Sequence, residues 1–446
     1  MSSLVSRVCT YLSQVTSGIP YIAFTVSFGL MVDMASFGLL VPVLPYRLEA
    51  IGYAEVAAST SYLIAAFAFG LIVSSIPISI LGEMVKSRKL PLLAGLTCLA
   101  ASLAAFWLSS SFAVLVISRI IQGFSGTAIW TLGLALICDV VPEARIGVVM
   151  GYVLIGWSIG TVAGPLIGGL LYDSYGYDAI FIFALSMTAV DFVLRSLVQD
   201  KKCIQNIAAP APLDAELDAE KPAECAGDAR PKPASAARAV LSLLTNPRVL
   251  TLFALTLVIG FAFGGLLDTG LAMLVKHRYG LSSHGAALMF IAVVVPSVVS
   301  SPIAGHLADK IGAKTPVVSL LLLGTPFFGL MSINASLPAL VTFIAFAGIF
   351  MLALAAPLMQ DLAEVVKVTP GLGFAHVYGI FNMVYSTGAM IGSLCVGGLL
   401  QGLGIESGWQ VMCLLITGLF AASVVPAWLF IGGPRATRAE EAASPV

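Results

Sequence analysis

The chain has 446 residues, of which 59% are hydrophobic and only 10% are charged, a composition outside the range of soluble globular proteins. It predicts a polytopic membrane protein, and the formal net charge of −1 gives no indication of a nucleic-acid partner. The seven cysteines are scattered without metal-ligand or disulfide spacing, so neither a metal nor another cofactor is expected.

Apolar runs long enough to cross a bilayer recur along the whole chain. Windows of roughly 19 residues bounded by charged or turn residues separate six runs in each half. The twelve runs are centred near Ser36, Gly70, Leu99, Gly126, Gly160, Ala189, Phe261, Val294, Leu323, Phe350, Ala389 and Gly418. The predicted fold is an all-α membrane protein whose twelve transmembrane helices form two pseudo-symmetric six-helix bundles.

The polar segments divide this chain into domains. Residues 1–20 are expected to form an N-terminal tail without a cleavable signal peptide, so the first helix would act as the targeting signal. Residues 21–199 and 247–432 form the two bundles, 200–246 a disordered linker rich in Ala, Pro and charge, and 433–446 the C-terminal tail. Lys and Arg concentrate on the side of the tails and linker, which predicts that side to be cytoplasmic.

The first predicted helix contains Asp33. An ionised carboxylate at the bilayer centre costs ~2.5 to 3.5 kcal/mol, so this side chain should face a protein or water-filled interior, or carry a proton. Asp33 is therefore a candidate proton or substrate site. The alternative interpretation is an Asp that caps a helix or ties two helices together.

Arg119 lies in the fourth helix, in the sequence Arg119-Ile120-Ile121-Gln122-Gly123. A guanidinium keeps its proton in proteins, so Arg119 must be paired or hydrated, and it can promote the release of a proton from a nearby carboxyl group. The alternative is a side chain that extends to the membrane surface near the outer end of its helix.

A run of glycines marks the fifth helix. Gly156, Gly160, Gly164, Pro165, Gly168 and Gly169 lie within one apolar segment. Glycines four residues apart share a helix face, which lets a neighbouring backbone approach closely, and Pro165 lacks the N–H of a regular helix and predicts a kink. The run is expected to seal the interface between the bundles; a simple packing seam is the alternative.

The second half carries further candidates. Asp268 in the seventh helix is the counterpart of Asp33, although a solvated residue at the helix end is an equal alternative. Asn382 in the eleventh helix could line a central cavity or join two helices. The segment with Gly305, Asp309, Lys310, Gly312 and Lys314 is expected to form a tight cytoplasmic turn with basic anchors.

These features resemble those of a known family. The glycine run closed by Gly164-Pro165, the Arg119 segment and the Gly305 loop are similar to signatures of the major facilitator superfamily. The resemblance covers nearly the whole chain and points to the twelve-helix drug–proton antiporters, in the branch of vesicular amine transporters and fungal exporters. It implies that Asp33 meets a cationic substrate and that Arg119 acts in proton coupling.

The resemblance has departures. Ser79 and Glu83 replace the glycine and aspartate expected in the first cytoplasmic loop. Leu352 and Asn382 occupy positions that are acidic in the amine-carrier branch, which weakens the expectation of amine transport with the same proton stoichiometry.

Together the sequence predicts a secondary active transporter, not an enzyme, that exchanges protons for a small organic compound such as a drug or secondary metabolite by alternating access. The alternatives are an organic acid exporter, with Arg119 meeting the anion, and a non-transporting membrane scaffold or sensor. The expected partners are the substrate, protons and the lipid bilayer, without nucleic acid, and the expected state is a monomer. The expected location is the plasma membrane, with an intracellular vesicle or vacuole as the alternative.

Overall fold

The computed structural model of the chain describes residues 15–85, 87–141, 146–198, 245–368 and 374–432. The described elements are helices, and each of the twelve predicted centres falls inside one of them. Most of the predicted N-terminal tail and nearly all of the linker and the C-terminal tail lie outside the described residues.

The first bundle contains six crossing helices and one short helix. The crossing helices are α2 (Ile19–Gly38), α4 (Val56–Met84), α5 (Lys89–Leu108), α6 (Phe112–Val140), α7 (Ile146–Tyr175) and α8 (Tyr177–Leu197). The short helix α3 (Leu44–Ala50) follows α2 and begins around Pro45, whose fixed φ suits the first turn of a helix.

The second bundle repeats this plan with two of its crossings broken into pieces. Its elements are α11 (Pro247–Ala262), η2 (Phe263–Leu271) and α12 (Ala272–Tyr279), then α13 (Ser283–Ile311), α14 (Lys314–Leu330), α15 (Leu337–Ala353), α16 (Ala355–Val368), α17 (Phe374–Leu403) and α18 (Ile405–Phe430). In the described chain, eleven spans are long and apolar enough to cross a membrane, and α14 is a shorter apolar helix that completes the predicted set.

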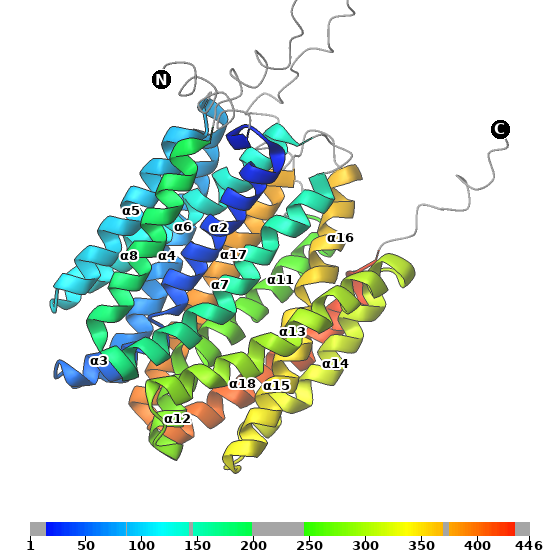
Figure 1. The fold of residues 1–446 in the computed structure, drawn as a ribbon. Coiled ribbons are helices and arrows are strands. Elements are labelled where there is room, and N and C mark those ends of the chain that lie inside the picture. Colours follow the sequence, from blue (N-terminus) through cyan, green and yellow to red (C-terminus); the bar gives the residue numbers. More distant parts are fainter. Residues whose placement is uncertain (1–14, 86, 142–145, 199–244, 369–373, 433–446) are drawn as a thin grey trace, which may run out of the picture.

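The packing inside the two bundles follows a common pattern, which supports the predicted duplication. α2 packs along α7 in the first bundle, and α11 packs along α17 in the second (Figure 1). Likewise α4 packs on α6, and α13 packs on α15. Each bundle has its own large apolar core, one centred on Leu30, Leu99 and Phe181 and the other on Leu266, Trp409 and Phe420.

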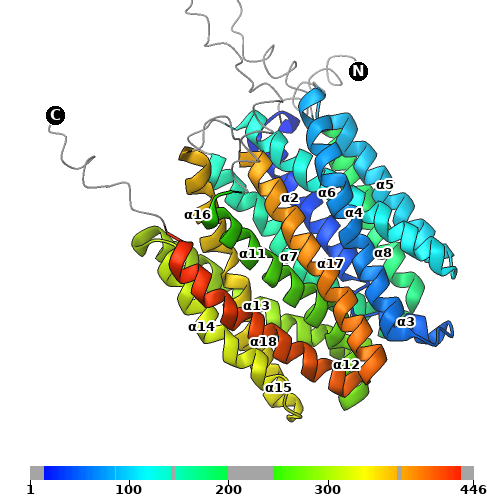
Figure 2. The ribbon, with the colours of Figure 1, turned by 180° about the vertical axis from the view of Figure 1, so that it is seen from behind.

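Two helix pairs join the bundles. α4 contacts α17, and α7 contacts α13, as both views of the ribbon show (Figures 1 and 2). The short helices α3 and α12 lie at one end of the molecule, which we call the α3 end, and α16 lies toward the other, which we call the α16 end. The two bundles therefore meet mainly along these four helices, which the internal repeat relates in pairs.

Candidate functional site

Asp33 lies inside the first bundle on α2. Its side chain is 1% exposed, and its Oδ1 atom has no hydrogen-bond partner. It faces α6 at Gly126, where an added Cβ would lie 3.1 Å from the carboxylate, so glycine makes the space for the acid. A buried carboxyl group without a partner is costly as an anion and is well suited to holding a proton.

Arg119 is completely buried on α6, so it does not extend to the membrane surface as the alternative interpretation supposed. Its Nη1 donates a hydrogen bond to Gln122 Oε1 at 2.8 Å, while its Nε and Nη2 have no partner. The rings of Phe106 and Phe37 lie 5.2 and 5.7 Å from the guanidinium carbon. The cation is thus held by aromatic faces and one amide, with two N–H groups left to bind an anion.

Asp268 lies on η2 in the second bundle and is 7% exposed, so it is not a solvated residue at a helix end. Its negative charge and the positive charge of Arg119 are close enough to interact, although they belong to different bundles. Tyr385 on α17 also lies within electrostatic reach of this carboxylate. Arg119 and Asp268 are therefore buried within electrostatic reach of each other, without a hydrogen bond or ion pair between them among the described contacts.

The segment around Asp268 is a π-helix, Phe263–Leu271, which the sequence analysis did not anticipate. Its widened turns leave carbonyl groups that need side-chain donors: the hydroxyls of Thr269 and Ser393 both donate to the Gly264 carbonyl. Wide turns of this kind occur often at functional sites. A signal was present in Gly264, Gly265 and Gly270, which lower helix propensity around the acid.

Asn382 is half-buried on α17, and no contact places it beside the charged residues described above. Its predicted role in lining a cavity stays a prediction.

The glycine run packs mainly inside the first bundle. An added Cβ on Gly160 or Gly164 would lie 2.5 Å from the Met31 carbonyl oxygen or 2.9 Å from that of Ala35, both on α2. Gly156 and Gly168 face α2 in the same way, and the Pro165 ring contacts Gly38. Only Gly169 of the run meets the other bundle, where an added Cβ would lie 2.6 Å from the Ser283 carbonyl oxygen. Close packing is as expected, but most of the run joins α2 to α7 instead of joining the bundles.

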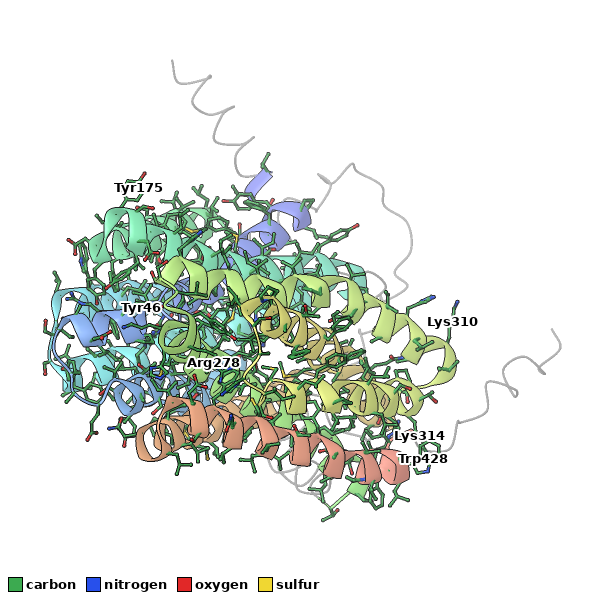
Figure 3. All side chains as sticks on the ribbon, turned by 90° about the horizontal axis from the view of Figure 1, so that it is seen from below. Tyr46, Tyr175, Arg278, Lys310, Lys314 and Trp428 are labelled. Carbon is green, nitrogen blue, oxygen red and sulfur yellow. The ribbon has the colours of Figure 1, made fainter. Side chains whose placement is uncertain are left out.

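The Gly305 loop ends α13 and starts α14. Gly312 caps α13 with φ of +87°, a conformation that favours glycine. Lys310 is exposed, and the Lys314 amine lies 4.5 Å from the centre of the Trp428 ring (Figure 3). The Asp309 side chain lies outside the described part of the chain, so its predicted capping role stays a prediction.

A set of polar contacts between the bundles, which the sequence analysis missed, lies at the α3 end. Tyr46 donates to the Leu281 carbonyl at 2.7 Å, and Glu49 forms an ion pair with Lys276. Asp173 on α7 accepts hydrogen bonds from the Ser283 hydroxyl and from the His284 backbone N–H, the latter at 3.0 Å. Figure 3 shows Tyr46 at this end of the molecule. These contacts close the bundles on each other at the α3 end.

The site therefore contains one buried acid in each bundle and one buried, partly unpaired arginine near their interface. Such a set can take up or release a proton, and it can bind a charged organic group when the bundles separate.

The comparisons with known proteins are consistent over most of the chain. A sequence model of the Major Facilitator Superfamily matches residues 26–282 and 267–445. The MFS-type transporter ppzB of Metarhizium majus is 28% identical over 91% of this chain and 99% of its own length. The multidrug resistance protein MdtG of Enterobacter lignolyticus is 27% identical over 66% of each chain.

Solved structures share the fold. A bacterial homolog of the human lysosomal transporter Spinster has a TM-score of 0.69 at 14% identity, covering 92% of this chain and 96% of its own. The human organic anion transporter MFSD10 has a TM-score of 0.59 at 19% identity, covering 92% of this chain and 99% of its own.

Proposed function

The chain belongs to the Major Facilitator Superfamily of membrane transporters, and on that premise we propose that it exports a small organic compound in exchange for protons, by alternating access between its two bundles. Relatives among the multidrug resistance proteins support the direction of transport.

The observation that carries this proposal is the pair of buried acids. Asp33 and Asp268 lie on equivalent helices of the two bundles, and both are nearly inaccessible to solvent. Asp33 would carry the proton or meet a cationic group of the substrate. Arg119, within electrostatic reach of Asp268, would favour the proton-free state of that acid when the bundles close.

One coupled proton is sufficient for useful export. A single charge moving through ~100 mV gains ~2.3 kcal/mol, and a tenfold concentration gradient requires ~1.4 kcal/mol. For an uncharged substrate, a single exchanging carboxyl group can therefore sustain more than a tenfold gradient.

The polar contacts at the α3 end fit one state of the transport cycle. The distribution of Lys and Arg supports an orientation with the α3 end on the outer side of the membrane and both tails in the cytoplasm. In this assignment the Glu49–Lys276 and Asp173–Ser283 contacts close the outer side and must break before substrate leaves. We propose a monomer in the plasma membrane, with a vesicle or vacuole as the alternative location.

The test is transport in proteoliposomes under an imposed pH gradient, with ethidium as the cationic probe and fluorescein as the anionic one. We expect Asp33→Asn to abolish transport driven by the pH gradient, because an amide cannot carry the proton. Glu406→Gln is the matched control, since it removes one partner of the Arg278–Glu406 ion pair within the second bundle and leaves both buried acids in place. Unchanged pH-driven transport in Asp33→Asn contradicts the coupling role.

A second candidate is export of an organic acid. It is favoured by the two unpartnered nitrogen atoms of Arg119, which could bind a carboxylate. Preference for fluorescein over ethidium, lost in Arg119→Gln, would support it. If neither probe nor a wider panel of compounds is moved by the wild-type protein, the non-transporting scaffold or sensor becomes the better interpretation.

A further inference from the structure

A buried ion pair on α8 lies next to Asp33 and is not used by the transport scheme above. Arg195 Nε donates to both carboxylate oxygens of Asp191, at 3.1 and 3.0 Å. The two side chains are 3% and 0% exposed. The two residues are four positions apart on α8, so they share one face of the helix.

The guanidinium of this pair is only partly satisfied. Its Nη1 and Nη2 atoms have no hydrogen-bond partner, although both are buried. The guanidinium lies against Gly29 of α2, where an added Cβ would overlap Nη2 and lie 2.7 Å from Cζ. Gly29 precedes Asp33 by four residues, about 6 Å along the helix. Arg195 therefore has free donors about one turn from an acid whose Oδ1 is unpartnered.

Polar or small residues continue from this point toward the α16 end along one row of α2. Tyr21, Thr25, Gly29 and Asp33 follow each other at four-residue spacing, which places them on one helix face. Thr25 is 1% exposed, and its hydroxyl lies near that of Tyr21 without a hydrogen bond of normal length. The Tyr21 hydroxyl, at the start of the row, donates to the Leu194 carbonyl of α8 at 2.9 Å.

Of the other helices around Asp33, α6 also carries a buried polar row, with Gln122 and Arg119 at helical spacing before Gly126, but this row leads back toward the start of α6 and away from the cytoplasmic side. α7 faces α2 with the glycine run, and α6 faces the acid with Gly126. The charges of Arg195 and Asp191 are the ones that act on Asp33 among the groups described around it. The contact between α2 and α8 is thus the charged side of the Asp33 environment.

We propose that Asp33 exchanges its proton with the cytoplasmic side through the interior of the first bundle, along the α2–α8 contact, with Arg195 as the positioning residue. The proposal rests on the proposed function and gives the proton a route separate from the substrate path between the bundles. The proton leaves the Asp33 carboxyl group for water reached through the Thr25 and Tyr21 hydroxyls. Arg195 keeps its own proton and donates an Nη–H hydrogen bond to the carboxylate that remains.

The test follows the proton itself and needs no substrate. Infrared spectra of the purified full-length protein are recorded during transfer to D₂O, and the protonated-carboxyl band of Asp33 is identified by its absence in Asp33→Asn. We expect exchange of this band to slow about tenfold in Thr25→Val and in Arg195→Gln, the effect of losing one hydrogen bond along the route. Arg195→Lys should restore part of the rate because it keeps the charge.

The controls separate this route from a general loss of structure. Glu406→Gln removes one partner of an ion pair in the other bundle, and its exchange rate should match the wild type. Thr25→Val keeps the size of the side chain, so it serves if Arg195→Gln does not fold. A wild-type exchange rate in Thr25→Val, or in a folded Arg195→Gln variant, would overturn the route alone. Absence of any band that depends on Asp33 would instead overturn Asp33 as the proton carrier.

Discussion

At the scale of residues, the sequence identified the buried charges but not their neighbours. Asp33, Arg119 and Asp268 stand out because a charged side chain inside an apolar run is costly and rare. Their surroundings come from helices far away in sequence: Gly126 makes room for Asp33, and Arg119 lies within electrostatic reach of Asp268 in the other bundle. No local pattern predicts such pairings, since each depends on how whole helices pack.

The interaction of Arg119 with Asp268 gives a residue-scale prediction. We expect Arg119→Gln and Asp268→Asn each to reduce pH-driven transport about tenfold, a loss of about 1.4 kcal/mol. Because both changes remove the same interaction, the double variant should be no worse than either single one. Transport rates in proteoliposomes provide the measurement, and losses that simply multiply would show that the two residues act independently.

At the scale of elements, all twelve predicted helix centres were correct, because the apolar runs are long and bounded by polar residues. The π-helix and the division of the seventh and tenth crossings were not predicted. Hydropathy reports how apolar a segment is and carries little information on which carbonyl each N–H meets. The glycine run predicted close helix packing, but hydropathy does not indicate which helix packs against the glycines.

The seam between α2 and α7 can be tested through stability. An added methyl at Gly168 would overlap the Leu39 backbone, and overpacking of this kind costs about 1–3 kcal/mol. We therefore expect Gly168→Ala to lower the thermal midpoint of the detergent-purified protein. Gly418→Ala is the matched control on α18, where nothing lies within 4 Å, and it should have no destabilising effect. Equal midpoints for the two variants would contradict a tight seam.

At the scale of the whole molecule, closure at the α3 end can be tested by cross-linking. With the seven native cysteines replaced, Glu49→Cys and Lys276→Cys should form a disulfide on oxidation, because the native pair is in contact. We expect the cross-link to stop transport and a reducing agent to restore it, since the bundles must separate at this end.

The matched control links residues within one bundle. Arg278→Cys and Glu406→Cys join α12 to α18 at the same end of the molecule, so their disulfide should leave transport intact. Continued transport with the Glu49–Lys276 positions linked would mean that this end does not open during the cycle.

The two kinds of contact made by α7 have a joint mechanical consequence. Its glycines pack closely against α2, and Asp173 in its last turns accepts a hydrogen bond from the His284 backbone N–H of α13. If the contacts of Asp173 with Ser283 and His284 break, α7 and α2 are expected to move together as one rigid unit, and Asp33 moves with them. In the proposed export cycle, opening of the α3 end would therefore also change the distance between the two buried acids, which would couple protonation of either acid to that opening.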